Sequence, residues 1–139
     1  MKLRIAFALA AAFALCISAG AQERTGTLAD CMKRHPDPGS AATCIRLAQR
    51  QASDEMLEAF EATQRRIRAL DGGDGALAAA LTESQRDFER YVQGQCTFVH
   101  AVFARAGIAD WAALACETDL LLQRTAALRP FAGIGNTTH

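Results

Sequence analysis

The chain has 139 residues, of which 50% are hydrophobic and 22% are charged, and its 15 basic residues balance its 15 acidic ones. It has no basic stripe interleaved with aromatic residues, so it is not typical of a nucleic-acid-binding protein. The length suits one domain with a hydrophobic core of its own.

The first residues follow the pattern of a secretory signal peptide. Lys2 and Arg4 form a positive start, residues 5–17 form a short apolar core, and residues 19–21 (Ala-Gly-Ala) match a cleavage site. The apolar run is shorter than the about 20 residues of a membrane span. We therefore expect residues 1–21 to be removed and the mature chain to be periplasmic or secreted, in a bacterial envelope, without membrane insertion.

The remaining chain is rich in Ala, Leu, Arg, Glu and Gln, which favour helix. No segment alternates with the period of a strand. We expect an all-α fold, a four-helix antiparallel bundle of one short and three longer helices. It would form a single domain over residues 22–131, followed by a flexible tail over residues 132–139.

Proline, glycine and capping residues place the four expected helices at residues 27–34, 41–70, 76–106 and 110–128. A Pro-Asp-Pro-Gly turn precedes Ser40, which is the expected N-cap of the second helix. The segment DGGDG at residues 71–75 is the expected second turn. Gly107 ends the third helix, Asp110 is the expected N-cap of the fourth, and Pro130 is expected to end it.

Residues three or four positions apart are expected to face the core of each long helix. They are Ile45, Ala48, Ala52, Met56, Phe60, Ile67 and Leu70 in the second helix, Leu77, Leu81, Phe88, Val92, Val99 and Phe103 in the third, and Trp111, Leu114, Thr118, Leu121, Thr125 and Leu128 in the fourth.

Four cysteines remain after residue 21, and an even number in an exported chain favours disulfides. Residues equidistant from the turn of a helical hairpin lie at the same height. Cys31 and Cys44 are symmetric about the first turn, and Cys96 and Cys116 are symmetric about a point beside Gly107. A Cys44–Cys96 pair would be about 9 Å out of register, beyond the reach of a disulfide. The sequence therefore predicts the pairs Cys31–Cys44 and Cys96–Cys116.

A zinc site is the alternative for the cysteines. Cys31 and His35 are four residues apart, as are Cys96 and His100, and two such pairs could form a Cys2His2 site. That arrangement would leave the other two cysteines unpaired in an oxidising compartment.

The chain shows no catalytic signature such as G-x-S-x-G, H-E-x-x-H or a phosphate-binding loop. Glu83, Asp87 and Glu117 could pair as glycosidase acids do, but acids on polar helices are usually solvated. We predict that the protein is not an enzyme, with no catalytic residues and no cofactor. An envelope hydrolase and a periplasmic metal carrier are the alternatives.

The segment LTESQRDFERYVQGQC, residues 81–96, resembles the signature of the LprI-like lysozyme-inhibitor family, L-x-x-A-Q-R-x-W-x-x-Y-R-D-x-x-C. Ser84 and Phe88 stand where the family has Ala and Trp, so the resemblance is to a divergent member. The residues in register are Gln85, Arg86, Tyr91 and Cys96.

This resemblance implies an exported helical protein that binds a protein partner, a lysozyme, and inhibits it. We expect the inhibition to come from occlusion of the lysozyme cleft. A lysozyme cleft holds two carboxylates, which a cation on a stiff loop could approach. The candidate partner-binding residues are Lys33, Arg34 and His35 beside the first bridge, and Arg105 at the second. A structural or interaction role with another envelope partner is the alternative. The sequence leaves the partner and the oligomeric state open.

Overall fold

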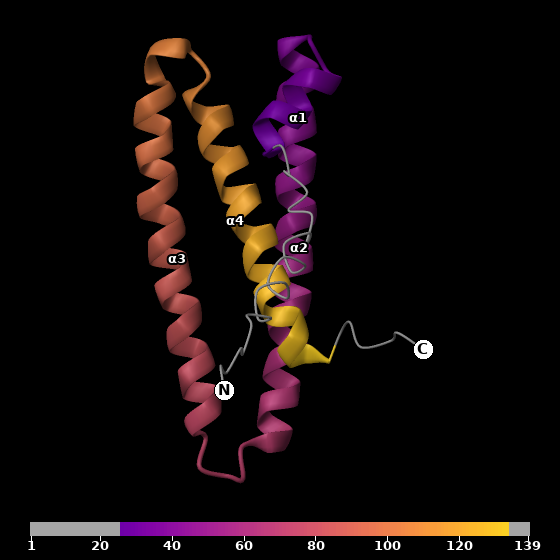
Figure 1. Ribbon diagram of the computed structural model, residues 1–139, viewed down its shortest axis with the longest axis vertical. Helices are drawn as coiled ribbons and strands as arrows, with labels where there is room; N and C mark the ends of the chain where they lie inside the picture. Colours follow the sequence, from indigo (N-terminus) through magenta and orange to yellow (C-terminus); the bar gives the residue numbers. More distant parts are fainter. Residues whose placement is uncertain (1–25, 134–139) are drawn as a thin grey trace, which may run out of the picture.

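The computed structural model describes residues 26–133 and contains four α-helices (Figure 1). They are α1 (Thr27–Arg34), α2 (Pro38–Leu70), α3 (Ala76–Phe103) and α4 (Ala109–Ala132), with a short 3-10 helix, η1 (Ala104–Ala106), between α3 and α4. The described residues contain no strand, and the predicted all-α, four-helix fold is confirmed. The expected signal peptide and nearly all of the expected tail lie outside the described residues.

Successive helices run in opposite directions, and α4 lies between α2 and α3 (Figure 1). The main packing contact joins α2 to α4, which run parallel to each other, while α2 and α3 touch over a short stretch only. Most buried side chains of α2 are small, and small residues allow two helix backbones to approach closely. The buried residues of α2 are Ala41, Ala42, Ile45, Ala52, Ala59 and Thr63.

Two hydrophobic clusters form the core. One consists of the buried residues Cys31, Ile45 and Ala115, with Trp111 packed against it. The other consists of the buried residues Ala59, Leu81 and Leu128, with Phe60 and Ile67 packed against it.

Two residues predicted to face the core, Leu70 and Leu77, are 59% and 48% exposed. Both flank the α2–α3 turn, and Figure 1 shows that α4 ends before reaching that end of the molecule. Without a third helix there, these two side chains have less surface to pack against.

The start of the second helix, α2, differs from the prediction. Asp37, not Ser40, is the N-cap of α2, because its Oδ2 accepts a hydrogen bond from the Ser40 backbone N–H at 2.8 Å. The helix therefore begins at Pro38. Proline suits the first helical position, where its missing N–H has no intrahelical partner to lose.

The two boundaries predicted for α4 are also wrong. Ile108 occupies the N-cap position, and Asp110 lies in the first turn of the helix. At the other end, the helix continues through Pro130 to Ala132 and is followed by Gly133 in the left-handed conformation, with φ of 71°. Pro130 lacks the N–H that would bond to the Ala126 carbonyl, so it interrupts the helical hydrogen bonds only in the last turn.

The predicted turn at residues 71–75 is present, and its first residue caps the start of the next helix. Asp71 is 8% exposed, and its two carboxylate oxygens accept hydrogen bonds from the backbone N–H groups of Leu77 and Ala78, at 3.0 and 3.1 Å. Gly73 and Gly75 adopt positive φ angles of 100° and 73°, which glycine tolerates best.

Candidate binding surface at the disulfide-stapled end

Two disulfides hold the corners of the helical bundle. Cys31 is bonded to Cys44 and Cys96 to Cys116, with Cα atoms 5.7 Å apart in each pair. Both predicted pairings are therefore present. The α1–α2 corner and the α3–α4 corner lie at the same end of the molecule, opposite the α2–α3 turn (Figure 1).

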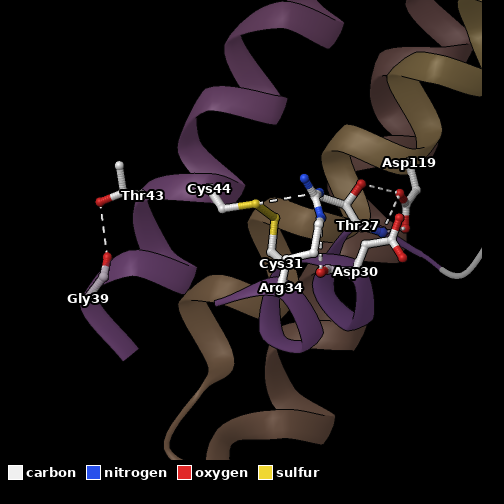
Figure 2. The surroundings of a disulfide bond; sticks show 8 residues. All are labelled: Thr27, Asp30, Cys31, Arg34, Gly39, Thr43, Cys44 and Asp119. Atoms are coloured by element: carbon white, nitrogen blue, oxygen red, sulfur yellow. Dashed lines mark hydrogen bonds between the residues drawn. A yellow bond between two sulfur atoms is a disulfide. The ribbon is translucent and has the colours of Figure 1, made fainter. Parts of the chain in front are cut away.

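The short helix α1 is attached to the rest of the molecule at two points (Figure 2). At its start, Asp119 of α4 accepts hydrogen bonds from the backbone N–H of Thr27 at 3.0 Å and from its Oγ1 at 2.6 Å. Farther along, the fully buried Cys31 joins the helix covalently to α2. An eight-residue helix is marginal alone in water, so these attachments fix its position.

The cationic residues predicted to bind a partner lie shortly after Cys31 in the chain. Lys33 and Arg34 lie exposed in the last turn of α1, and half-buried His35 comes next as its C-cap. Figure 2 shows the Arg34 guanidinium beside the disulfide, where Nε donates to the Asp30 carbonyl at 3.3 Å and Nη2 lies 3.7 Å from Cys44 Sγ. These contacts with Asp30 and Cys44 orient the side chain of Arg34.

Arg105, the fourth predicted binding residue, is exposed in η1 at the other corner. Gly107 follows with φ of 72° and closes that corner above the Cys96–Cys116 bridge. The fold therefore places Arg105 and the Lys33–Arg34 pair at one end of the molecule, on separate corners.

The residues of the zinc alternative are not brought together as a site. Cys31 and Cys96 belong to different disulfides, and His100 Nε2 lies 3.1 Å from Asp110 Oδ1. Among residues 26–133, no three His, Cys, Asp or Glu side chains are grouped so that they could hold a metal ion.

The carboxylates considered for hydrolysis have ordinary partners. Glu83 and Asp87 both pair with Arg90 on the exposed face of α3. Glu117, on α4, accepts a hydrogen bond from the Gln49 side chain at 3.4 Å.

The signature residue Gln85 belongs to a polar contact between α3 and α4. Its Oε1 accepts from Arg124 Nε at 3.2 Å, and its Nε2 donates to Glu89 at 3.2 Å. The Arg124 guanidinium also lies 5.5 Å from the centre of the Phe88 ring, a cation–π distance. Partial burial lowers the pKa of Arg124, although a guanidinium stays charged in proteins.

Sequence reasoning missed a groove of about 730 Å³ between α3 and α4, with Met56 of α2 at one end. It forms because α4 packs along both neighbours while α2 and α3 diverge. Apolar side chains and three carboxylates line it together. Each helix by itself showed only an amphipathic pattern, and the shared surface depends on how the helices are placed.

No helix in residues 26–133 is long and apolar enough to cross a membrane. The fold and its stapled corners define a small disulfide-bridged α-helical protein. A family model described as lysozyme inhibitor LprI matches residues 16–128. The chain therefore belongs to the LprI family, as the signature over residues 81–96 predicted. Comparisons with curated proteins and with solved structures found no significant match.

Proposed function

We propose that this protein is exported and inhibits a lysozyme by inserting its Cys31–Cys44 corner into the substrate cleft. Membership of a family of inhibitors, rather than of enzymes, supports a binding role. The observation that carries the choice of site is the rigid attachment of α1, which holds Lys33 and Arg34 at an exposed corner.

Electrostatics favours this corner for a lysozyme cleft. The cleft carries two catalytic carboxylates, and complementary charge steers a partner and fixes its orientation. Arg34 is already oriented by the Asp30 carbonyl. Less side-chain entropy is therefore lost on binding than for a freely rotating arginine. Arg105, at the same end, would contact the rim of the cleft.

Export is supported by the two disulfides, because such bonds persist in oxidising compartments and are rare in a reducing cytosol. The mature protein would then meet lysozyme in the periplasm or outside the cell. Lysozyme would be a protein partner bound without catalysis.

The test is a titration of the full chain, expressed with its leader and purified oxidised from the periplasm, against lysozymes of several types. Lysis of cell walls reports the inhibition. We expect Lys33→Ala with Arg34→Ala to raise the inhibitory concentration at least about tenfold, which corresponds to about 1.4 kcal/mol.

The matched control is Arg66→Ala with Arg68→Ala, which removes two exposed cations of α2 near the opposite end. This variant should inhibit like the parent. Inhibition that is lost equally in both variants would reject the corner as the site. Failure to inhibit any lysozyme would reject the function.

A further inference from the structure

The groove between α3 and α4 is long and open, and most of its lining surface is apolar. Along α3 its lining runs from Gln85 to His100, which is about 22 Å at the rise of an α-helix. Its apolar side chains come from all three long helices and include Met56, Phe88, Val92, Leu114 and Leu121. All except Leu121 are only half-buried, so part of this apolar surface remains in contact with water.

The charged side chains that line the groove are mostly acidic. Glu89 comes from α3, Asp110 and Glu117 come from α4, and His100 lies at the end near the α3–α4 corner. Arg124, beyond the opposite end, already contacts Gln85 and the Phe88 ring. The carboxylates therefore face the groove without a lysine or arginine among its lining residues.

We propose that this groove binds a cationic amphipathic segment of a protein. Apolar side chains of the segment would cover Phe88, Val92 and Leu114, and its lysines or arginines would approach Glu89 and Glu117. An amphipathic helix in a groove is an established way to recognise a peptide. The length and openness of the groove fit a segment of about 15 helical residues, rather than a compact small molecule.

This inference does not depend on lysozyme inhibition, because the groove and the Cys31–Cys44 corner are formed by different residues. Changes in the groove leave Lys33 and Arg34 in place. Peptide binding and inhibition of lysis can therefore succeed or fail separately.

The probe is a fluorescently labelled helical peptide of about 15 residues, with leucines on one face and lysines on the other, followed by anisotropy with the oxidised full chain. A second peptide carries glutamate in place of every lysine. We expect the lysine peptide to bind, more weakly at high salt, and the glutamate peptide not to bind.

Two variants change the groove, one by removing two carboxylates and one by filling space. A control variant removes two carboxylates elsewhere. Glu89→Gln with Glu117→Gln should weaken binding about fivefold, as expected for two partly exposed ion pairs. The control, Glu58→Gln with Glu61→Gln, removes two exposed acids of α2 that lie outside the groove, and should bind like the parent. Ala113→Phe should block the groove without changing its charge, and circular dichroism checks that it folds.

The proposal is overturned if the lysine peptide does not bind. It is overturned as well if the groove variant, Glu89→Gln with Glu117→Gln, binds the peptide as strongly as the control variant on α2 does. It is also overturned if folded Ala113→Phe binds like the parent. Should Ala113→Phe fail to fold, the comparison of the two charge variants still decides.

Discussion

Asp119 of α4 caps the first helix through Thr27, a residue 92 positions earlier in the chain. Both carboxylate oxygens accept from the Thr27 backbone N–H, at 3.0 and 3.3 Å. Gly26 leaves room for this contact, because a Cβ at that position would lie 2.8 Å from Asp119 Oδ2. A helix that holds the candidate binding corner is thus anchored by a residue of the last helix.

Replacing Asp119 with Ala should lower the free energy of unfolding by about 1 kcal/mol, the usual effect of losing a helix N-cap. Denaturant unfolding measures the change. The control is Asp54→Ala, which removes an exposed aspartate in the middle of α2. Equal effects of the two substitutions would show that the contact with Thr27 does not stabilise the fold.

The two disulfides should stabilise the protein to a similar extent, because their sequence separations are 13 and 20 residues. Replacing both cysteines of either pair with Ala should lower the free energy of unfolding by about 3 kcal/mol. Only the loss of Cys31–Cys44 should also release α1, which is too short to persist alone.

Amide hydrogen exchange separates these two effects. Exchange in α1 should become fast when the Cys31–Cys44 pair is replaced, and α1 should stay protected when Cys96–Cys116 is replaced. Persistent protection of α1 in the first variant would mean that Asp119 and packing suffice to hold it. A thiol assay on unreduced parent protein should detect no free thiol in the mature chain.

Thr63 links α2 to α4 inside the core. It is 1% exposed, and its Oγ1 lies 2.8 Å from the Ala59 carbonyl and 3.2 Å from the Leu128 carbonyl. Thr63→Val keeps the shape but removes the hydroxyl, so we expect a loss of about 1 kcal/mol in the free energy of unfolding.

The control for Thr63 is Thr43→Val on the exposed part of α2. The Thr43 hydroxyl donates to the Gly39 carbonyl at 3.0 Å and accepts from Arg46 Nη2 at 3.2 Å, and both partners belong to its own helix. Thermal or denaturant unfolding should show a smaller change for this variant. A larger effect at Thr43 than at Thr63 would contradict the assignment of Thr63 as an interhelical link.

Asp37 should make the stability of α2 depend on pH at the acid end. The hydrogen bond from the Ser40 backbone N–H, assisted by the Ser40 side chain, lowers the pKa of the Asp37 carboxyl. A carboxyl with a lowered folded pKa contributes stability above its unfolded pKa, about 3.9, and loses it as the pH falls through the folded pKa.

Replacing Asp37 with Asn tests this dependence. Asparagine is also a good N-cap but does not titrate, so the melting temperature of the variant should fall less than that of the parent between pH 5 and pH 2. NMR titration of the Asp37 carboxyl gives its pKa directly. A carboxyl that titrates at or above the ordinary value would contradict the prediction.

Local sequence predicted the helices and turns well, because short-range interactions determine them. The bounds of the first helix, Thr27–Arg34, agree with the structure, and the glycines of residues 71–75 and Gly107 mark turns correctly. The boundary error at the start of α2 arose because two neighbouring residues, Asp37 and Ser40, could both serve as its N-cap.

The sequence also determined the disulfide pairing. Cysteines at equal distances from a turn must lie at equal heights on two antiparallel helices, and this simple geometry selected Cys31–Cys44 and Cys96–Cys116. The cationic residues beside the first bridge were chosen because the family resemblance implies a lysozyme partner with an acidic cleft, and their role in binding remains a prediction.

Only the tertiary structure decided how the helices pack on one another. The parallel contact of α2 with α4, the cap that Asp119 provides and the acidic groove all join residues far apart in the chain. A periodic sequence tells which face of a helix is apolar, but it does not tell which other helix will cover that face. That choice depends on the fit of whole helix surfaces, and here α4 covers α2 closely and leaves part of α3 open.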